Sequence, residues 1–295
     1  MVKIGHKEGI NLKDPDFWDE QWQTSRKAET TYTQCSPQST ALWEKQAEHF
    51  VANSGDNKRV NDTLTWLASQ GVVLNGMNVL DLCSGPGAFT FACSEPAAAV
   101  TALEPATAMV NFIRERINRE RQKNIHIIQL PWEDVDVEKQ GLSRHFDLVL
   151  ASSCPGIHSI ELLEKALLCT TTYFYFYGWA GARENDALDA LWRYLYHSDI
   201  PSWPDDSLYI LNWLHAKRYN FSLDVKEDRR VEESSVEKAT KALLFLLDLH
   251  GKSVVGLEDQ VADFVRQRAK DGIFCQTSIS RRARILVTLT NANSG

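Results

Sequence analysis

The spacing of apolar residues in the first quarter of the chain predicts helices. Two stretches place apolar residues three or four positions apart, as on one face of an amphipathic helix. Their apolar residues are Trp43, Ala47, Phe50 and Val51, and then Val60, Leu64, Leu67 and Ala68. The preceding residues 1–40 are polar with scattered aromatic residues, and they predict an N-terminal arm with one short helix.

After a turn signal at Asn75-Gly76, short apolar runs alternate with helical stretches. The apolar runs predict strands at residues 77–82, 100–103, 125–130, 146–151 and 171–177. The stretches between them predict helices at residues 88–94, 106–121 and 160–168. Strand–helix units of this size predict a parallel sheet with helices on both faces.

The last third of the chain breaks this rhythm. It predicts helices at residues 186–196, 206–217, 234–250 and 257–265, and strands at residues 221–232 and 283–290. Ser234 and Glu237 form a capping-box pattern at the start of the third of these helices. The predicted fold class is therefore α/β, with a doubly wound, mostly parallel sheet of seven strands, helical insertions and an N-terminal helical arm.

The expected organisation has three parts. Residues 1–70 form the arm and first helices, residues 71–180 the ligand-binding core, and residues 181–295 the rest of the sheet. Two insertions, at about 181–220 and 234–272, are longer than ordinary connections. We expect them to form helical lids over the carboxyl ends of the strands, where such elements shape a substrate pocket and exclude water.

The run from Asn78 to Phe89 carries the strongest chemical signal. A buried strand ends in Asp81, and Gly85 and Gly87 follow in a turn that opens a helix. Glycine allows close approach of a ligand, and a helix start offers unpaired N–H groups. Glu104 ends the next strand, where a carboxylate commonly accepts hydrogen bonds from ribose hydroxyls. These features together predict a ligand that contains a nucleoside.

The same run argues against a dinucleotide. The fingerprint G-x-G-x-x-G needs glycine at position 90, where the chain has Thr90. Asp81 would also repel a pyrophosphate. A nicotinamide-dependent oxidoreductase is therefore the disfavoured enzyme alternative, and a non-catalytic regulator that binds the same nucleoside ligand is the other alternative.

The motifs resemble those of class I S-adenosylmethionine-dependent methyltransferases. Residues 79–87 are similar to motif I of that family, and Glu104-Pro105 with Met109 to motif II. Residues 127–134 and 146–152 look like the motifs at its third and fourth strands. The resemblance covers about residues 77–160 and implies a Rossmann-like fold, methyl transfer and S-adenosylmethionine as cofactor.

The resemblance also implies roles for single residues. Asp81, Gly85 and Gly87 would border the methionine part of the cofactor, and Glu104 would hold the ribose hydroxyls. The other implied contacts are Pro105 and Met109 near the adenine, Trp132 and Glu133 along the adenine edge, and Ser152 under the sulfonium.

Two positions depart from the family pattern. Cys83 replaces the first glycine of motif I, so we expect the turn to avoid a positive φ there. Pro131 replaces an acid that often reads the adenine amino group, which leaves Glu133 or a backbone carbonyl for that contact.

The sequence need not contain a catalytic signature, because methyl transfer depends mainly on alignment of the reacting groups. After the fourth strand the chain lacks the Asp/Asn-Pro-Pro-aromatic tetrapeptide, which disfavours amino methylation of adenine or glutamine. His158 is a weak candidate for a base, and a histidine at a helix start explains it more simply. Cys154 fits a buried thiol better than a nucleophile. Trp18, Trp22 and Tyr32 fit either a lid over the cofactor or an anchor for the arm.

Composition narrows the partners. The chain has 295 residues and a formal charge of −7, which disfavours nucleic acid and favours a small-molecule acceptor. No apolar run approaches the ~20 residues that span a bilayer, and the six cysteines form no C-x-x-C pair, so we expect a cytoplasmic protein without a metal site. We expect residues 173–177 to form a buried strand and residues 281–284 the solvated face of an edge strand. No pattern indicates an oligomeric state.

Overall fold

The computed structural model describes residues 11–28, 40–41, 43–44, 47, 58–201 and 205–289. Its strands are β1 (Asn78–Leu82), β2 (Ala99–Leu103), β3 (Ile125–Ile128), β4 (Phe146–Ser152), β5 (Thr170–Asn185), β6 (Asn220–Ser235) and β7 (Ile273–Thr288). Its α-helices are α1 (Pro15–Ala28), α3 (Lys58–Ser69), α4 (Ala88–Ser94), α5 (Thr107–Glu120), α6 (Ile160–Cys169), α7 (Asp186–Tyr196), α8 (Asp206–Ala216), α9 (Val236–Leu249) and α10 (Glu258–Arg268). None of these helices, over the residues described, is both long and apolar enough to cross a membrane.

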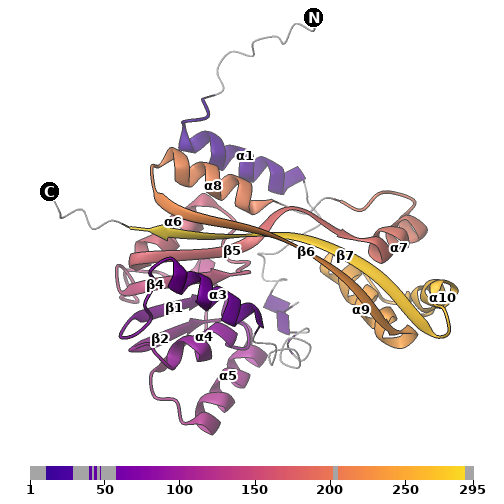
Figure 1. Ribbon diagram of the computed structural model, residues 1–295, viewed down its shortest axis with the longest axis horizontal. Coiled ribbons are helices and arrows are strands. Elements are labelled where there is room, and N and C mark those ends of the chain that lie inside the picture. Colours follow the sequence, from indigo (N-terminus) through magenta and orange to yellow (C-terminus); the bar gives the residue numbers. More distant parts are fainter. Residues whose placement is uncertain are drawn as a thin grey trace, which may run out of the picture.

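The strands form one seven-stranded sheet in the order β3-β2-β1-β4-β5-β7-β6. Strands β1 to β5 run parallel, and β7 lies antiparallel between β5 and β6. Figure 1 shows α6 and α8 on one face of the sheet and α3, α4 and α5 on the other. The predicted doubly wound, mostly parallel α/β fold with seven strands is confirmed.

The alternation of buried residues along the strands explains the two layers. Leu80 and Val149 pack toward the core that includes α6 and α8, whereas Val79 and Leu148 pack toward α3 and α4. Both faces of the central strands are buried, so these strands read as apolar runs rather than as an alternating pattern. The same chemistry explains residues 173–177, whose Phe174, Tyr175 and Phe176 side chains are buried as predicted.

The last three strands are much longer than predicted. Strands β5, β6 and β7 each have 16 residues, and they continue past the main sheet as an antiparallel extension. Helices α7, α9 and α10 pack on this extension around buried Leu191, Leu243 and Phe264. Figure 1 shows the resulting lobe beside the main body of the fold. Helix α9 begins at the predicted place, but its capping residue is Ser235, which accepts a hydrogen bond from the Lys238 N–H.

The prediction for residues 281–284 was wrong. Strand β7 is an inner strand, because β5 and β6 pair with its two edges. Arg284 is 6% exposed and lies 3.4 Å from Asp224, and its guanidinium also donates to the Asp62 carbonyl at 3.0 Å. The solvated edge is β6, whose outer half is rich in charged residues that discourage pairing with another chain.

The N-terminal arm is anchored to the body of the fold. Helix α1 packs against α8 in Figure 1. Trp22 of α1 is fully buried, stacks on Tyr209 and donates its indole N–H to Asp206 at 2.7 Å. Trp18 packs at the edge of the same core. The anchor interpretation therefore holds for both tryptophans, and Tyr32 lies outside the described residues. Helix α8, within the first predicted insertion, belongs to this face, whereas α7 belongs to the lobe.

Candidate active site

The loop after β1 forms the floor of the site. Gly85 and Gly87 have φ angles of 55° and 83°, which glycine adopts without steric cost. A Cβ on Gly87 would lie 3.0 Å from the Phe91 ring, so a side chain at the start of α4 would force that ring to shift. A Cβ on Gly85 would meet nothing within 4 Å, so there is open space above the loop at this residue.

Cys83 corrects one expectation. Its φ is 53°, so the turn keeps the left-handed conformation although the residue is not glycine. A non-glycine residue pays roughly 1–2 kcal/mol for this conformation. The Cys154 thiol donates to the Cys83 sulfur at 2.9 Å, and Cys154 is buried as predicted. The contact joins the loop after β1 to the loop after β4.

This strain leads to a stability prediction. We expect Cys83→Val to lower the free energy of unfolding by about 1–3 kcal/mol, because a β-branched residue at positive φ is strongly disfavoured. Cys83→Gly is the matched control, since it also removes the thiol contact but accepts the conformation. Denaturant unfolding of both variants would measure the difference, and equal stability of the two would contradict the assigned backbone conformation.

Glu104 closes the other side of the loop. It is 5% exposed, and its two carboxylate oxygens accept the backbone N–H groups of Gly85 at 2.9 Å and Ala106 at 3.0 Å. Burial raises the pKa of Glu104, although both backbone donors oppose the shift. Each oxygen keeps a second lone pair that can accept a hydroxyl. The carboxylate thus fastens the ends of β1 and β2 together and still has capacity to bind a ligand.

Asp81 lies at the end of β1 and is 2% exposed. Its carboxylate accepts the Thr90 hydroxyl at 2.6 Å. Burial raises the pKa of Asp81 to about 7, the hydrogen bonds with Thr90 oppose that shift, and the nearby charge of Glu104 adds to it. The site therefore contains an acid that changes charge near neutral pH.

The residues expected at the adenine end gather around the start of α5. Met109 is 3% exposed and packs with Ala106 and with Trp43, and Pro105 is half-buried beside them. Glu44 caps α5, because its carboxylate accepts the N–H groups of Thr107 and Ala108. Residues described between positions 40 and 47 therefore reach this edge, whereas Phe50 and Val51 of the predicted helix lie outside the described residues.

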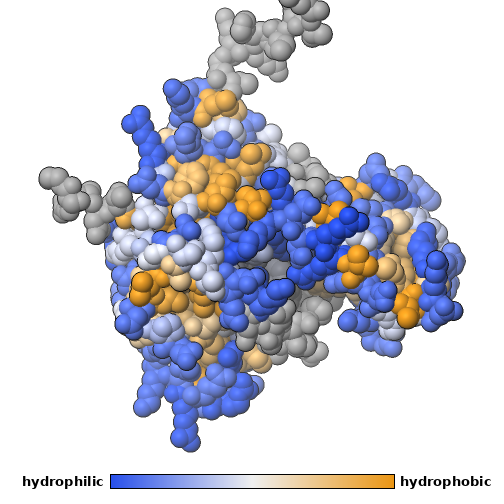
Figure 2. Space-filling view, viewed as in Figure 1, coloured by the Kyte–Doolittle hydropathy of each residue, from blue (hydrophilic) through white to orange (hydrophobic). Residues whose placement is uncertain are grey.

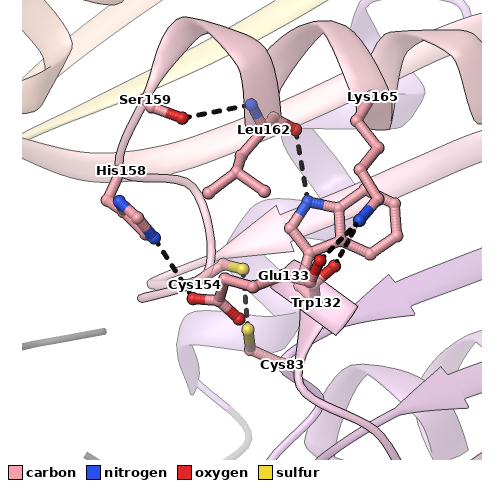
Figure 3. Close-up of polar contacts among 8 residues, drawn as sticks. All are labelled: Cys83, Trp132, Glu133, Cys154, His158, Ser159, Leu162 and Lys165. Carbon is pink, nitrogen blue, oxygen red and sulfur yellow. Dashed lines mark hydrogen bonds and ion pairs between the residues drawn. The ribbon is translucent and has the colours of Figure 1, made fainter. Parts of the chain in front are cut away.

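Trp132 and Glu133 form a short 3-10 helix beside α6 (Figure 3). The Trp132 indole is 1% exposed and donates its N–H to the Leu162 carbonyl at 3.2 Å, so its side chain belongs to the core. Glu133 lies 3.2 Å from the ring of His158, which directly precedes the Ser159 cap of α6. Burial raises the pKa of Glu133, but the contact with His158, a backbone hydrogen bond and the charge of Lys165 together outweigh it and leave the pKa below its usual value. His158 is thus a partner of Glu133 at a helix start.

The end of β4 adds polar groups without partners. The Ser152 and Ser84 hydroxyl oxygens are buried and accept or donate no hydrogen bond among the described residues. Buried polar groups normally have a partner, and a bound ligand can supply one. Together with the open space above Gly85 and the free lone pairs of Glu104, these hydroxyls fit a polar nucleoside ligand such as S-adenosylmethionine. The structure therefore brings Asp81, Cys83, Gly85, Glu104 and Ser152 to one edge of the sheet.

The structure also contains a groove that no sequence motif indicated. A groove of about 1640 Å³ runs from α3 along the extension of β5, β6 and β7 to α9, and its inner end is lined by Arg59, Tyr177 and Arg282. Figure 2 shows mainly hydrophilic residues around the hollow between the main body and the lobe. The arginines at 281–284 were the one local signal for this groove. Only the strand order of the sheet shows that Arg282 and Arg284 line it. The inner end of this groove reaches the loop after β4, because Arg59 and Arg282 both donate to the Ser153 hydroxyl.

Comparisons with known proteins agree with the fold and the loop. The family model described as a methyltransferase domain matches residues 79–169. No curated protein matches the sequence. The YcgJ protein from Bacillus subtilis is 11% identical, with a TM-score of 0.50 over 79% of this chain and 100% of that one. Magnesium protoporphyrin IX methyltransferase from Synechocystis, solved with S-adenosylhomocysteine, is 12% identical, with a TM-score of 0.45 over 92% of this chain and 99% of that one. A methyltransferase domain therefore spans residues 79–169, and the chain shares the Rossmann-like fold of these solved structures.

Proposed function

We propose that this methyltransferase transfers the methyl group to a small-molecule acceptor bound in the groove beside the lobe. The observation that carries the proposal is the position of the groove, whose inner end meets the carboxyl end of β4 at Ser153. Its volume of about 1640 Å³ exceeds the roughly 300–1,000 Å³ of ordinary ligand pockets. The lobe, within residues 181–295, would then serve as the acceptor-binding part, next to a donor-binding core at residues 71–180.

The donor roles follow the loop geometry. We assign Gly85 and Gly87 to the close approach of the methionine part, Glu104 to the ribose hydroxyls, and Ser152 to the vicinity of the sulfonium. Pro105 and Met109 would pack near the adenine, and Glu133 would reach its edge. Trp132 would contribute through its backbone, because its indole is enclosed by the core.

When bound, S-adenosylmethionine would supply an electrophilic methyl group, which is transferred in line to the acceptor as the methyl–sulfur bond breaks and S-adenosylhomocysteine is left. The chain's own part is alignment, which can supply roughly 7–11 kcal/mol of rate enhancement. The loops after β1 and β4 are held together by the contact of Cys83 with Cys154, so they present one rigid edge to both reactants. The lobe would exclude water from that edge.

The raised pKa of Asp81 makes donor binding depend on pH. Because the pKa of Asp81 is about 7, its carboxyl group is mostly protonated at pH 6 and mostly ionised at pH 7.5. The cofactor carries cationic groups, which favour the ionised carboxylate. We expect the affinity for S-adenosylmethionine to rise about eightfold between pH 6 and pH 7.5, and Asp81→Asn to abolish this rise. Titration calorimetry at both pH values would measure it, and an equal rise in the Asp81→Asn variant would refute the assignment.

The proposed acceptor class is tested by transfer of label. The purified protein would be incubated with methyl-labelled S-adenosylmethionine and a cell extract divided into a low-molecular-weight fraction, RNA and protein. We expect label to enter the low-molecular-weight fraction. Label confined to RNA or protein would overturn the small-molecule acceptor, and absence of transfer to any fraction would favour a non-catalytic binding role.

A further inference from the structure

Two arginines converge on the hydroxyl of Ser153, the residue that follows β4. The guanidinium of Arg59, near the start of α3, donates to the Ser153 oxygen at 3.3 Å, and the guanidinium of Arg282, on β7, donates to the same oxygen at 3.4 Å. Residues 59, 153 and 282 are distant in sequence, so the fold has brought two cations to one point. That point adjoins Ser152 and lies at the inner end of the groove.

Aromatic rings hold Arg282 in place. Its guanidinium carbon lies 3.4 Å from the centre of the Trp179 ring and 5.3 Å from the centre of the Tyr177 ring. Arg183 lies 4.5 Å from the same Trp179 ring. Such stacking fixes the plane of a guanidinium and leaves its N–H fork free for a planar anion.

Several positive charges lie close to Arg282 in this cluster. Burial lowers the pKa of Arg282 to about 10; Tyr177 opposes that shift, and the charges of Arg183, Arg59 and Arg230 add to it. Each additional cation raises the local positive potential and favours a bound anion that neutralises it.

Several other cations of the groove have acidic partners. Arg230 pairs with Asp228, Lys241 with Glu237, and Arg284 with Asp224. Arg59 and Arg282 form no ion pair with any carboxylate among the described residues. The acidic residues that line the groove are Asp62, Glu184, Asp189, Glu227, Asp228, Glu232, Glu237 and Asp248. The half-buried guanidinium of Arg282 is costly without a counter-charge, so its contrast with the paired cations points to an anionic ligand.

We propose that Arg59 and Arg282 form an anion subsite that binds a carboxylate or phosphate group of the methyl acceptor, so that the acceptor is an anionic small molecule. This inference rests on the proposed function. The guanidinium fork matches the oxygens of either group in a bidentate arrangement. Because Ser153 follows Ser152, an anion held there places the rest of the acceptor next to the proposed position of the methyl group.

The subsite can be tested by titrating the protein with small anions. Benzoate and phenyl phosphate serve as probes for the two chemistries, and benzyl alcohol serves as the neutral control. Each probe is titrated calorimetrically into the full chain with and without S-adenosylhomocysteine. We expect at least one anion to bind and the alcohol not to bind. The preferred probe identifies carboxylate or phosphate as the group recognised.

Variants of neighbouring arginines make the test specific. We expect Arg59→Gln and Arg282→Gln to weaken anion binding about tenfold or more each, because each removes a charged donor. Arg281→Gln is the matched control, since it makes the same charge change one residue away. Arg281 lies on the opposite side of β7, where its positive charge interacts with the carboxylate of Asp205. We expect that variant to bind anions within twofold of the parent chain.

The outcomes separate this inference from the proposed function. Absence of binding by both anions, or equal weakening by Arg281→Gln and Arg282→Gln, would overturn the subsite. As a second readout, a low-molecular-weight extract is separated on an anion-exchange resin before the methylation assay, and acceptor activity is expected in the retained fraction. Activity confined to the unretained fraction would overturn the anionic acceptor while leaving the proposed function intact. Failure to bind S-adenosylhomocysteine in the same samples would instead remove the proposed function.

Discussion

Glu104→Gln is expected to weaken binding of S-adenosylmethionine about 10- to 100-fold. The carboxylate accepts backbone N–H groups from Gly85 and Ala106, and its remaining lone pairs are assigned to the ribose hydroxyls. A glutamine retains the shape, but its NH₂ group faces a donor and its neutral oxygen loses charge-assisted bonding. Hydrogen bonds to charged groups contribute about 1.5–3 kcal/mol, which corresponds to this loss of affinity.

The measurement is titration calorimetry with S-adenosylmethionine, together with thermal unfolding of the free protein. Glu115→Gln is the matched control, because Glu115 is exposed on the neighbouring helix α5 and makes the same change in charge. We expect that control to bind with unchanged affinity. Parent-like affinity in a folded Glu104→Gln variant would refute the assignment of Glu104 to the ribose.

Trp22→Ala is expected to lower the free energy of unfolding by about 3–5 kcal/mol, the range observed for large aromatic residues in cores. Trp22 is fully buried, stacks on Tyr209 of α8 and donates to Asp206 at 2.7 Å. The substitution leaves a cavity between α1 and α8 and leaves Asp206 with Arg26 as its partner on α1. Denaturant unfolding would measure the loss.

Trp22→Phe separates packing from hydrogen bonding. It keeps most of the ring and removes the indole N–H, so we expect a loss of about 1–2 kcal/mol. Gln21→Ala on the same helix controls for a general effect on α1, because Gln21 is exposed and should change stability little. A change below 1 kcal/mol for Trp22→Ala would contradict the docking of the arm on α8.

The local pattern of apolar residues was sufficient to predict the central part of the fold. Helix α4 occupies the predicted residues 88–94, and β1 and β2 agree with prediction to within a residue. Strands that are buried on both faces have continuous apolar sequences, and the glycine turn after β1 is recognisable from a few neighbouring residues. The residues of this turn and Glu104 accordingly meet at one edge.

The extension of β5, β6 and β7 could not be predicted in the same way. Residues 178–185 contain two glycines and two charged residues, and the outer half of β6 is rich in charged residues, so neither has an apolar alternation. These segments are strands because each pairs with β7. The buried position of Arg284 and the inward position of Arg282 follow from that pairing, which is a property of the sheet order rather than of any local run.

Cys83 shows a different limit. Steric rules predict that a residue with a Cβ avoids positive φ, yet the loop adopts 53° there. The surrounding structure outweighs the local cost, since Ser84 donates its N–H to Leu103 on β2 and Cys154 contacts the Cys83 sulfur. Strain at a loop that borders a ligand site is a case in which tertiary contacts override a local rule.

The most direct test of the account is parallel titration of the purified chain with S-adenosylmethionine, S-adenosylhomocysteine and NADH. The account predicts saturable one-to-one binding of both S-adenosyl compounds and no binding of NADH, because Thr90 and Asp81 are unsuited to a pyrophosphate. Binding of NADH alone would contradict it and would assign the loop after β1 to a dinucleotide.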